Sequence, residues 1–355
     1  MNPTSSERNT KATIRDVALA ANVSIGTVSK IINLRKTFSS DVETRVKKAA
    51  RDLGYYSNPM ASGMVTGRTK AVGLVILDIS NPHFTAMVKG AHRVALKHGY
   101  NMLFVDTEEN QSAEAELISA LIHRVDGLIL SSRLPDEKLH AMLAMGKPIV
   151  FAGRKAPEGQ PSISVDGHHA ARMLGQFLGR QGHRKILYLG FPAAVPDRER
   201  YRGLVEGLSE FDCELQRFDI EAPTIAEGTK ASAIVLLGVQ RYDAAVCFND
   251  LVALGFANGA SALGITIPQS LSVVGFDDIP FAAFAHPPLT TVNMQSERCG
   301  EQAMLMLLDC LNPSESKQPR NVTLLPQLQI RGSTMARHPE KSTPPSHTSA
   351  ALLPL

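Results

Sequence analysis

Seven short and almost continuously apolar runs follow one another through most of this chain of 355 residues. Such runs are typical of parallel strands that are buried on both faces of a sheet. Stretches of helical periodicity separate most of them, for example residues 84–97 and 251–263. The alternation predicts an α/β fold, and about 260 residues suffice for two doubly wound parallel-sheet lobes. The runs are AVGLVILD from residue 71, YNMLFVD from 100, DGLILSS from 126, KPIVFAG from 147, KILYLG from 185, DAAVCFN from 243 and LSVVGFDD from 271.

The region before these runs has a different pattern of apolar residues. Residues 12–33, with the sequence ATIRDVALAANVSIGTVSKIIN, have the periodicity of two short helices joined by a tight turn. Thr13 and Asp16 have the spacing of a capping box for the first helix, and Ser24 is placed to cap the second. With the helix that follows, the pattern predicts a small all-α head over residues 12–57.

A third helix is expected next. Ser39 or Ser40 can cap it, and Ser40 has the spacing of a second capping box with Glu43. Val46 and Ala49 lie on one face at helical spacing and would close a core with the first two helices. Three helices within about forty residues form only a thin core.

The second helix of the head has a narrow polar face opposite its apolar one. A helix with such an edge can enter a major groove and place side chains against base edges. Residues 11–68 contain ten basic and four acidic residues, a net charge of +6, whereas the whole chain carries +3. Both features fit a partner rich in phosphate, although an ordinary helical hairpin with a solvated basic surface would show the same pattern. The polar face consists of Gly26, Thr27, Ser29, Lys30 and Asn33.

A short segment, NPMASGMVTGR over residues 58–68, joins the head to the first strand. Asn58 suits an N-cap and Pro59 suits the first position of a helix. So short a helix is marginal in water, and Gly63 costs about 1 kcal/mol more relative to Ala. We therefore expect the segment to be disordered when free and helical only when held, the alternative being a plain flexible linker. Residues 336–355, rich in Ser, Thr and Pro, are expected to form a disordered tail.

Several classes of protein are disfavoured by the sequence. The four cysteines are widely spaced and form no CxxC or zinc-binding pattern, which favours a reducing cytosol. The first residues lack the apolar core of a signal peptide and no run is long enough to span a membrane, so a cytoplasmic protein is expected. There is no P-loop, G-x-S-x-G or HExxH in a plausible context, and the adjacent His168 and His169 cannot share a helix face. Neither a cofactor nor a bound metal is expected.

Ligands of open parallel sheets bind beyond the carboxyl ends of the strands. In this chain those ends lead into loops with charged and aromatic side chains. Several arginines facing one cleft would suit a carboxylate or phosphate, although each could equally form a surface or interlobe ion pair. Asp166 could line the cleft or cap the helix that begins at Gly167, and we expect the former. The arginines near strand ends are Arg133, Arg154 and Arg198.

Taken together, these segments resemble the lac repressor/galactose repressor family of bacterial transcription regulators. The resemblance extends from about Thr13 to Thr334 and implies a helix-turn-helix head, a hinge helix over residues 58–68 and a two-lobed core like periplasmic sugar-binding proteins. The core would comprise residues 70–335, with lobe 1 at about 70–181 and 293–320, and lobe 2 at about 183–290 and 321–335. The segments that carry the resemblance include TIRDVALAANVSIGTVSKIIN, LGYYSNPMASGMVTGRT, ISNPHF, SVDGHHAA, FNDLVALG, LSVVGFDDIP and PLTTV.

The resemblance also implies which residues meet DNA. The start of the second helix reads bases, which places Ile25 and Gly26 at the reading positions, and Met64 of the hinge helix would wedge into a base step of the minor groove. Gly26 has no side chain and Ile25 offers only apolar contact, so base discrimination by this helix should be modest. The other implied contacts are Thr13, Ser24, Thr27, Ser29, Lys30, Asn33, Ser39, Asn58, Met60 and Ala61.

The family further implies a repressor that binds a roughly palindromic double-stranded operator as a homodimer, with affinity switched by a small effector between the lobes. Arg200 in RERYRG and Asp250 in FND match the family's effector-contacting arginine and aspartate. A carbohydrate-type effector is expected, with a sugar acid or sugar phosphate favoured by the arginines. Relatives differ in whether the effector releases or tightens DNA binding. The predicted effector site is completed by His83, Phe84, Ser132, Arg154, Asp166 and Asp277.

Alternatives to this function have different sequence requirements. A sugar-processing α/β enzyme would need a nucleophile or an acid–base pair in the cleft, and a regulator of nucleobase metabolism would bind a purine-type effector. A transport binding protein would need a signal peptide and has no use for the head. A dimer is expected rather than a tetramer, because the tail lacks leucine heptads.

Overall fold

The computed structural model describes residues 12–32, 38–56, 68–157, 159–312 and 321–337. The chain divides into two compact units, residues 1–70 and 71–355, which are described separately below. Among the predicted DNA contacts, Asn33, Asn58, Met60, Ala61 and Met64 lie outside the described residues. The same holds for residues 338–355 of the predicted tail.

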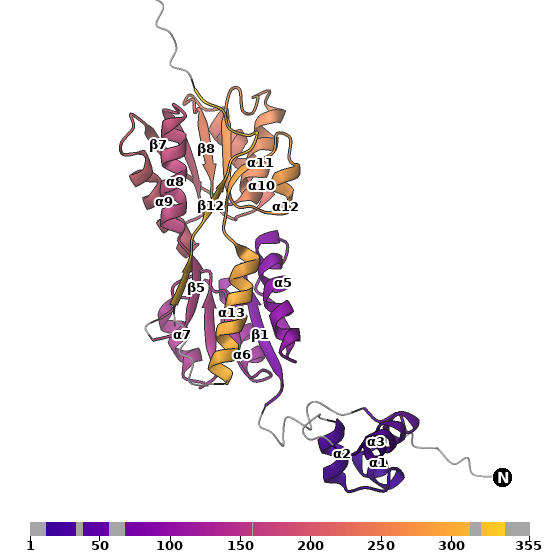
Figure 1. The fold of residues 1–355 in the computed structure, drawn as a ribbon. Helices are drawn as coiled ribbons and strands as arrows, with labels where there is room; N and C mark the ends of the chain where they lie inside the picture. The colour runs from indigo at the N-terminus through magenta and orange to yellow at the C-terminus, as the bar shows by residue number, and fades with distance from the viewer. Residues whose placement is uncertain (1–11, 33–37, 57–67, 158, 313–320, 338–355) are drawn as a thin grey trace, which may run out of the picture. The chain divides into compact units, whose positions relative to one another are not determined.

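The head is the three-helix unit that the sequence predicts (Figure 1). The Asp16 carboxylate accepts hydrogen bonds from the backbone N–H and the hydroxyl of Thr13, at 2.7 and 2.8 Å. Ser24 Oγ accepts the N–H of Thr27 at 3.1 Å and so caps the second helix. The helices are α1 (Ile14–Ala20), α2 (Ile25–Ile32) and α3 (Ser40–Asp52). Their buried core consists of Val17, Ala18, Ala21, Val28, Ile31, Val46 and Ala49.

The start of α3 differs in one detail from the prediction. Ser39 is the N-cap residue, and Ser40 is already helical. Glu43 does not form a capping box with Ser40. Its carboxylate accepts the N–H of Phe38 at 3.4 Å and pairs with Lys47 at 3.1 Å. The Glu43 carboxylate therefore binds the backbone of Phe38, the residue that precedes the N-cap Ser39.

The core unit contains two six-stranded sheets, one in each lobe. The sheet of lobe 1 has the order β11-β5-β4-β3-β1-β2, and the sheet of lobe 2 has the order β12-β10-β9-β8-β6-β7. All strand pairs are parallel except that of β10 with β12. This arrangement confirms the predicted pair of doubly wound lobes and adds one antiparallel edge strand in lobe 2.

The bounds of the elements follow the apolar runs closely. Lobe 1 has β1 (Ala71–Ile76), β2 (Asn101–Asp106), β3 (Leu128–Leu130), β4 (Ile149–Ala152), β5 (Ser162–Val165) and β11 (Asn321–Leu324), with α5 (Pro82–Lys97), α6 (Gln111–Ile122), α7 (Asp136–Leu143) and α13 (Ser296–Leu311). Lobe 2 has β6 (Lys185–Gly190), β7 (Glu214–Asp219), β8 (Ala244–Cys247), β9 (Ser272–Asp277), β10 (Thr290–Asn293) and β12 (Gln327–Gln329), with α8 (Gly167–Arg180), α9 (Val195–Leu208), α10 (Ile225–Leu236), α11 (Asp250–Ala262) and α12 (Pro280–Phe284).

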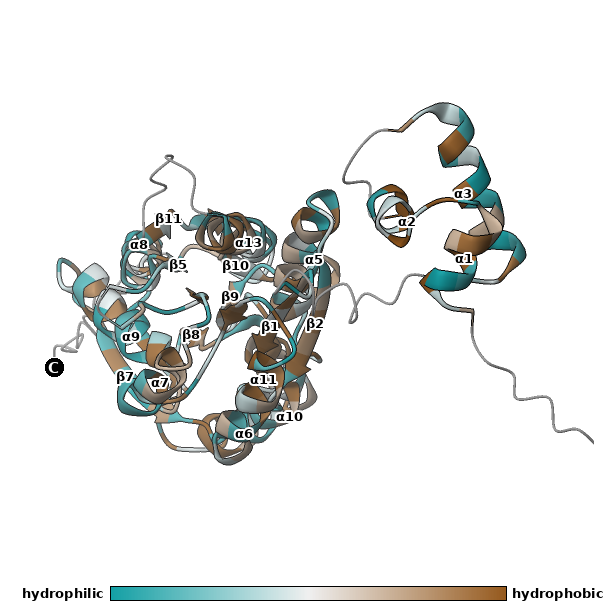
Figure 2. Cartoon of the chain, turned by 90° about the horizontal axis from the view of Figure 1, so that it is seen from below, coloured by the Kyte–Doolittle hydropathy of each residue, from teal (hydrophilic) through white to brown (hydrophobic). Residues whose placement is uncertain are grey.

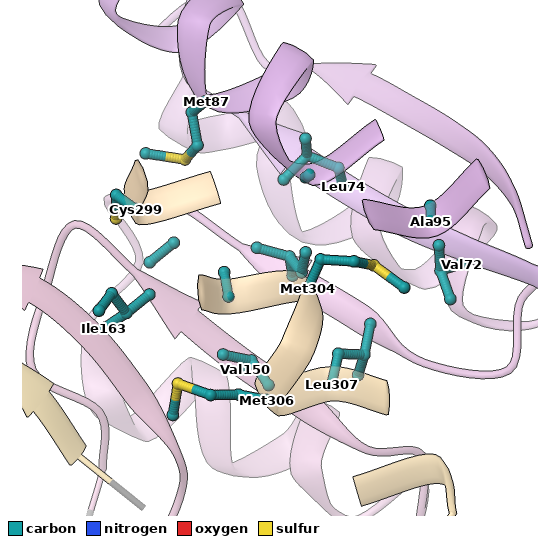
Figure 3. Close-up of a cluster of buried hydrophobic side chains, with 14 of the residues drawn as sticks. Val72, Leu74, Met87, Ala95, Val150, Ile163, Cys299, Met304, Met306 and Leu307 are labelled. Carbon is teal, nitrogen blue, oxygen red and sulfur yellow. The ribbon is translucent and has the colours of Figure 1, made fainter. Parts of the chain in front are cut away.

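Helices α5 and α13 cover one face of the lobe 1 sheet in close contact. A Cβ on Gly90 would lie 2.0 Å from the Glu297 carbonyl oxygen, and one on Gly300 would lie 2.0 Å from that of Met87. Only glycine permits this approach. Figure 3 shows Met304 and Leu307 among the buried side chains of this face, and Figure 2 shows strands β1 and β9 largely in the brown of hydrophobic residues.

The structure corrects the predicted boundaries of the lobes. Helix α8 packs in lobe 2, where Leu174 and Leu178 share a buried cluster with Ile186 and Leu204, so the first crossover lies at Asp166 and not near residue 182. Strand β11 pairs in parallel with β5, which assigns residues 321–324 to lobe 1. The pattern of apolar residues marks each element but not the sheet against which it packs.

Three chain segments connect the lobes. They pass at Asp166 between β5 and α8, at Met294 and Gln295 between β10 and α13, and at Leu325 and Pro326 between β11 and β12. In the part of the chain that the structure describes, no helix has the length and apolar character needed to cross a bilayer.

Candidate DNA-binding and effector sites

The predicted reading edge of α2 is exposed, whereas Val28 and Ile31 on its opposite side are buried. Ile25 is 45% exposed although it is a large apolar residue. A Cβ on Gly26 would meet only Ser24 Oγ, at 3.7 Å, so packing within the head does not require glycine at this position. Packing within the head therefore does not explain the residue types at Ile25 and Gly26. Of the described DNA contacts predicted from sequence, Thr13, Ser24, Ile25, Gly26, Lys30 and Ser39 are exposed, and Thr27 and Ser29 are half-buried.

A cleft lies between the two lobes, at the carboxyl ends of β1, β3 and β4 on one side and of β8 and β9 on the other. This is the position expected for a ligand of open parallel sheets. Six of the eight predicted effector residues line it: His83, Phe84, Ser132, Arg154, Arg200 and Asp277.

Arg200 is the most constrained side chain of the cleft. It lies on α9, is 5% exposed, and its guanidinium stacks on the rings of Phe248 and Phe276, with ring centroids at 4.8 and 4.5 Å. One Nη donates to the carbonyl oxygen of Phe248, and Nη2 lies 3.7 Å from the Asp277 carboxylate. Its Nε has no hydrogen-bond partner among the described residues. A buried donor without a partner is costly, so Arg200 is well placed to donate to a ligand oxygen.

Asp277 and His83 meet across the cleft. Asp277 ends β9 in lobe 2 with a φ of 114°, a conformation that residues other than glycine rarely adopt. Its carboxylate lies 3.5 Å from His83 Nδ1 of lobe 1, which is also within 2.8 Å of the Ser296 hydroxyl. Burial lowers the pKa of His83, although the Asp277 carboxylate opposes this shift. His83 is therefore neutral near pH 7 and acts as a polar contact between the lobes.

The other arginines of the cleft already have acidic partners. Arg133 forms a bidentate pair with Glu109, with both N···O distances at 2.8 Å. Arg154 pairs with Asp136 at 2.5 Å and donates to the carbonyl oxygen of Leu134 at 2.8 Å. The ion-pair alternative therefore holds for these two side chains. Arg198 is exposed on α9 and does not line the cleft.

Comparisons with known proteins match both units. Residues 13–58 match the model of bacterial regulatory proteins of the lacI family, and residues 176–334 match a periplasmic binding protein-like domain. The HTH-type transcriptional repressor CytR of Escherichia coli K12 is 32% identical over 336 residues, which cover 93% of this chain and 98% of CytR.

The chain belongs to the lacI family of bacterial regulatory proteins. It is a DNA-binding transcriptional repressor with an effector-binding core, not an enzyme. The sugar-processing alternative is thereby set aside.

Solved structures of this family agree with the fold. The lac repressor dimer bound to operator and the anti-inducer ONPF superimposes with a TM-score of 0.82 at 24% identity, covering 92% of this chain and all of that chain. The complex of the transcriptional regulator CelR with cellobiose gives a TM-score of 0.67 at 29% identity, covering 91% of this chain and 99% of that chain. The first of these similarities concerns the fold alone.

Two predicted effector residues of this lacI-family chain do not line the cleft. Asp250 is fully buried at the start of α11, where its carboxylate accepts the Thr291 hydroxyl at 2.5 Å and the N–H of Ile279 at 2.9 Å. Burial raises the pKa of Asp250 well above its usual range. Asp166 caps α8 by accepting the N–H of His169 at 2.8 Å, so the cap that the sequence left as the alternative is correct.

The residue that reaches the cleft in place of Asp250 is its neighbour Asn249. Asn249 caps α11 through the N–H of Val252 at 2.9 Å. The sequence FND contains both side chains, and only the turn between β8 and α11 decides which one faces the ligand. Other lining residues that the sequence analysis did not identify are Leu77, Asn81, Met87, Glu109, Pro196, Pro223 and Phe248.

Proposed function

We propose that this protein represses transcription as a homodimer on a roughly palindromic operator, and that a small effector in the interlobe cleft sets its affinity for DNA. The observation that carries the proposal is a buried cleft with polar groups from both lobes, in a chain that also has an exposed basic helix-turn-helix head. A ligand that contacts both lobes stabilises one lobe arrangement over another, and this difference in affinity is what an allosteric effector requires.

The cleft residues suit a ligand with hydroxyl groups and an apolar face. Arg200 Nε offers a donor and the Asp277 carboxylate offers an acceptor for hydroxyl groups. Phe84 and Phe248 provide rings beside them. Because Arg133 and Arg154 are already paired with carboxylates, a neutral sugar or nucleoside fits better than the sugar acid or sugar phosphate that the arginine count suggested.

A thermal-shift screen tests the class of effector. Neutral sugars, nucleosides, sugar acids, sugar phosphates and purines are each added to the full-length protein, since a ligand that binds the folded state raises the melting temperature by mass action. We expect the largest shift from a neutral sugar or a nucleoside. A shift obtained only with sugar acids or sugar phosphates would overturn this choice while leaving the DNA-binding role intact.

Selection of binding sites from a random duplex pool tests the DNA-binding role. We expect an enriched sequence with two-fold symmetry. Affinity for it should fall about a thousandfold or more between about 50 and about 200 mM salt, as phosphates lose their cationic partners. A salt-independent affinity, or enrichment of no sequence, would contradict the proposal.

Exposed apolar side chains of the core support dimer formation. Phe281 and Phe284 on α12 are 58% and 79% exposed, and the edge strand β2 exposes Leu103 and Phe104. Unpaired edge strands and exposed aromatic residues are features that a second subunit covers.

We therefore expect Phe284→Glu to shift the protein from dimer to monomer, because a charge would be buried at the interface. Sedimentation velocity measures the change. Val239→Glu is the matched control, since Val239 is fully exposed beyond α10 and is placed in no interface here. A dimeric Phe284→Glu variant would remove α12 from the proposed interface.

A further inference from the structure

Asp278, which follows the cleft residue Asp277, binds the segments that join the lobes. Its Oδ2 accepts Asn293 Nδ2 at 2.8 Å, and its Oδ1 accepts Arg331 Nη2 at 2.5 Å. Asn293 is the last residue of β10, directly before the second crossover, and Arg331 lies two residues after β12, the strand that the third crossover enters. One carboxylate therefore contacts the lobe 2 strand that leads into the second crossover and the chain beyond the strand that follows the third.

These anchors belong to a larger set of contacts between the crossovers. Gln295 of the second crossover donates its side-chain N–H to the carbonyl oxygen of Leu325 in the third, and its backbone N–H to Asn293 Oδ1 at 2.7 Å. The N–H of Asp166 in the first crossover donates to the carbonyl oxygen of Leu324 at 3.1 Å. All three connections are therefore tied to one another, and the Asp278 carboxylate fixes this set to lobe 2.

The two adjacent aspartates face different surroundings. Asp277 contacts His83 and Arg200 in the cleft, whereas Asp278 contacts Asn293 and Arg331 at the crossovers. Both residues have a positive φ, 114° and 57°, so the backbone between them is confined to a conformation that few residues adopt. A single peptide unit of confined conformation therefore joins the cleft residue Asp277 to Asp278 at the crossovers.

We propose that Asp278 is the positioning residue of the interlobe hinge. Its carboxylate holds the crossover segments in register and links them to the cleft. Its side chain is well shielded from water, with 14% exposed, and that of Arg331 is 21% exposed. The pair is therefore screened less than a surface pair. The hinge role concerns the core alone and does not depend on the proposed function.

Distances between the lobes in the full-length protein, without DNA or effector, test this role. Nitroxide labels are placed at Lys138→Cys in lobe 1 and Glu210→Cys in lobe 2, both exposed, in a background with Cys213→Ser and Cys310→Ser. The other two cysteines, Cys247 and Cys299, are buried. We expect Asp278→Asn to at least double the width of the distance distribution measured by double electron–electron resonance.

Partner variants separate a hinge role from a general loss of stability. Arg331→Gln should broaden the distribution as much as Asp278→Asn. The double variant should broaden it no further, because each single substitution already breaks the same Asp278–Arg331 ion pair. Asn293→Ala, which removes the other contact of Asp278 together with the bond from the Gln295 N–H, should also broaden the distribution and keeps the test decisive if Asp278→Asn fails to fold. Asp219→Asn is the matched control, because it breaks an Asp–Arg pair of 2.5 Å on β7, at the opposite edge of the same sheet.

Unchanged widths in Asp278→Asn and Arg331→Gln would overturn the proposal, as would equal broadening in Asp219→Asn. Additive broadening in the double variant would also reject it, since the two residues would then act separately. None of these results bears on the choice of effector or on DNA binding, so failure of the hinge role and failure of the proposed function remain distinguishable.

Discussion

Arg200→Ala should strongly weaken the effector response and leave binding to DNA unchanged. Arg200 lines the cleft, its guanidinium is buried between two rings and neighbours the Asp277 carboxylate, and its Nε has no hydrogen-bond partner among the described residues. A hydrogen bond to a charged group contributes about 1.5–3 kcal/mol, so effector affinity should fall about 10-fold to 150-fold. Titration calorimetry with the compound that gives the largest thermal shift measures this loss.

Two further variants make the Arg200 result specific. Arg198→Ala removes an arginine from the same helix that is exposed and lies outside the cleft, so effector affinity should match the parent. Arg200→Lys keeps the charge but loses the planar group that stacks on Phe248 and Phe276, and should recover little of the affinity. Parental affinity in Arg200→Ala would show that the ligand binds elsewhere.

Val46→Asp should eliminate DNA binding by unfolding the head alone. Val46 is fully buried in the small core that the described helices of the head share, and an unpaired carboxylate there costs several kcal/mol, about as much as so small a unit has. The core unit has its own buried clusters, so its melting transition and its effector affinity should not change. Differential scanning calorimetry and gel-shift titration measure the two effects.

The matched control is Thr44→Asp, which adds the same charge to an exposed position of the same helix. It should weaken DNA binding modestly, through repulsion of phosphates, and leave the head folded. Equal losses in the two variants would mean that charge, and not the packing of the head, explains the result.

The strands and helices of this protein can be predicted well from the sequence, because the patterns that identify them involve residues close together in the chain. Apolar runs buried on both faces identify the strands, and the carboxyl ends of those strands locate the cleft and most of its lining. Asp277 and His83 were found in this way, whereas Arg200, on α9, was predicted from the family resemblance. The Asp277 carboxylate lies 3.5 Å from His83 Nδ1 and 3.7 Å from Arg200 Nη2.

The errors arise where the outcome depends on tertiary contacts. The amphipathic pattern of α8 is the same whichever sheet it covers, so its place in lobe 2 follows only from its contacts with α9 and β6. The choice between Asn249 and Asp250 depends on one turn after β8. Arg133 pairs with Glu109, which lies 24 positions away in the sequence, and no periodic pattern of residues predicts such a pair.

The open space at Gly26 has a consequence for how this regulator acquires new targets. Since a Cβ at this position would meet no described atom of the head closer than 3.7 Å, glycine can be replaced here without a clash at Cβ that would push α2 away from α1 and α3. A single substitution there can add a base contact worth about 1–3 kcal/mol of discrimination. The family member could thus move to a different set of promoters through one codon, while sensing the same metabolite.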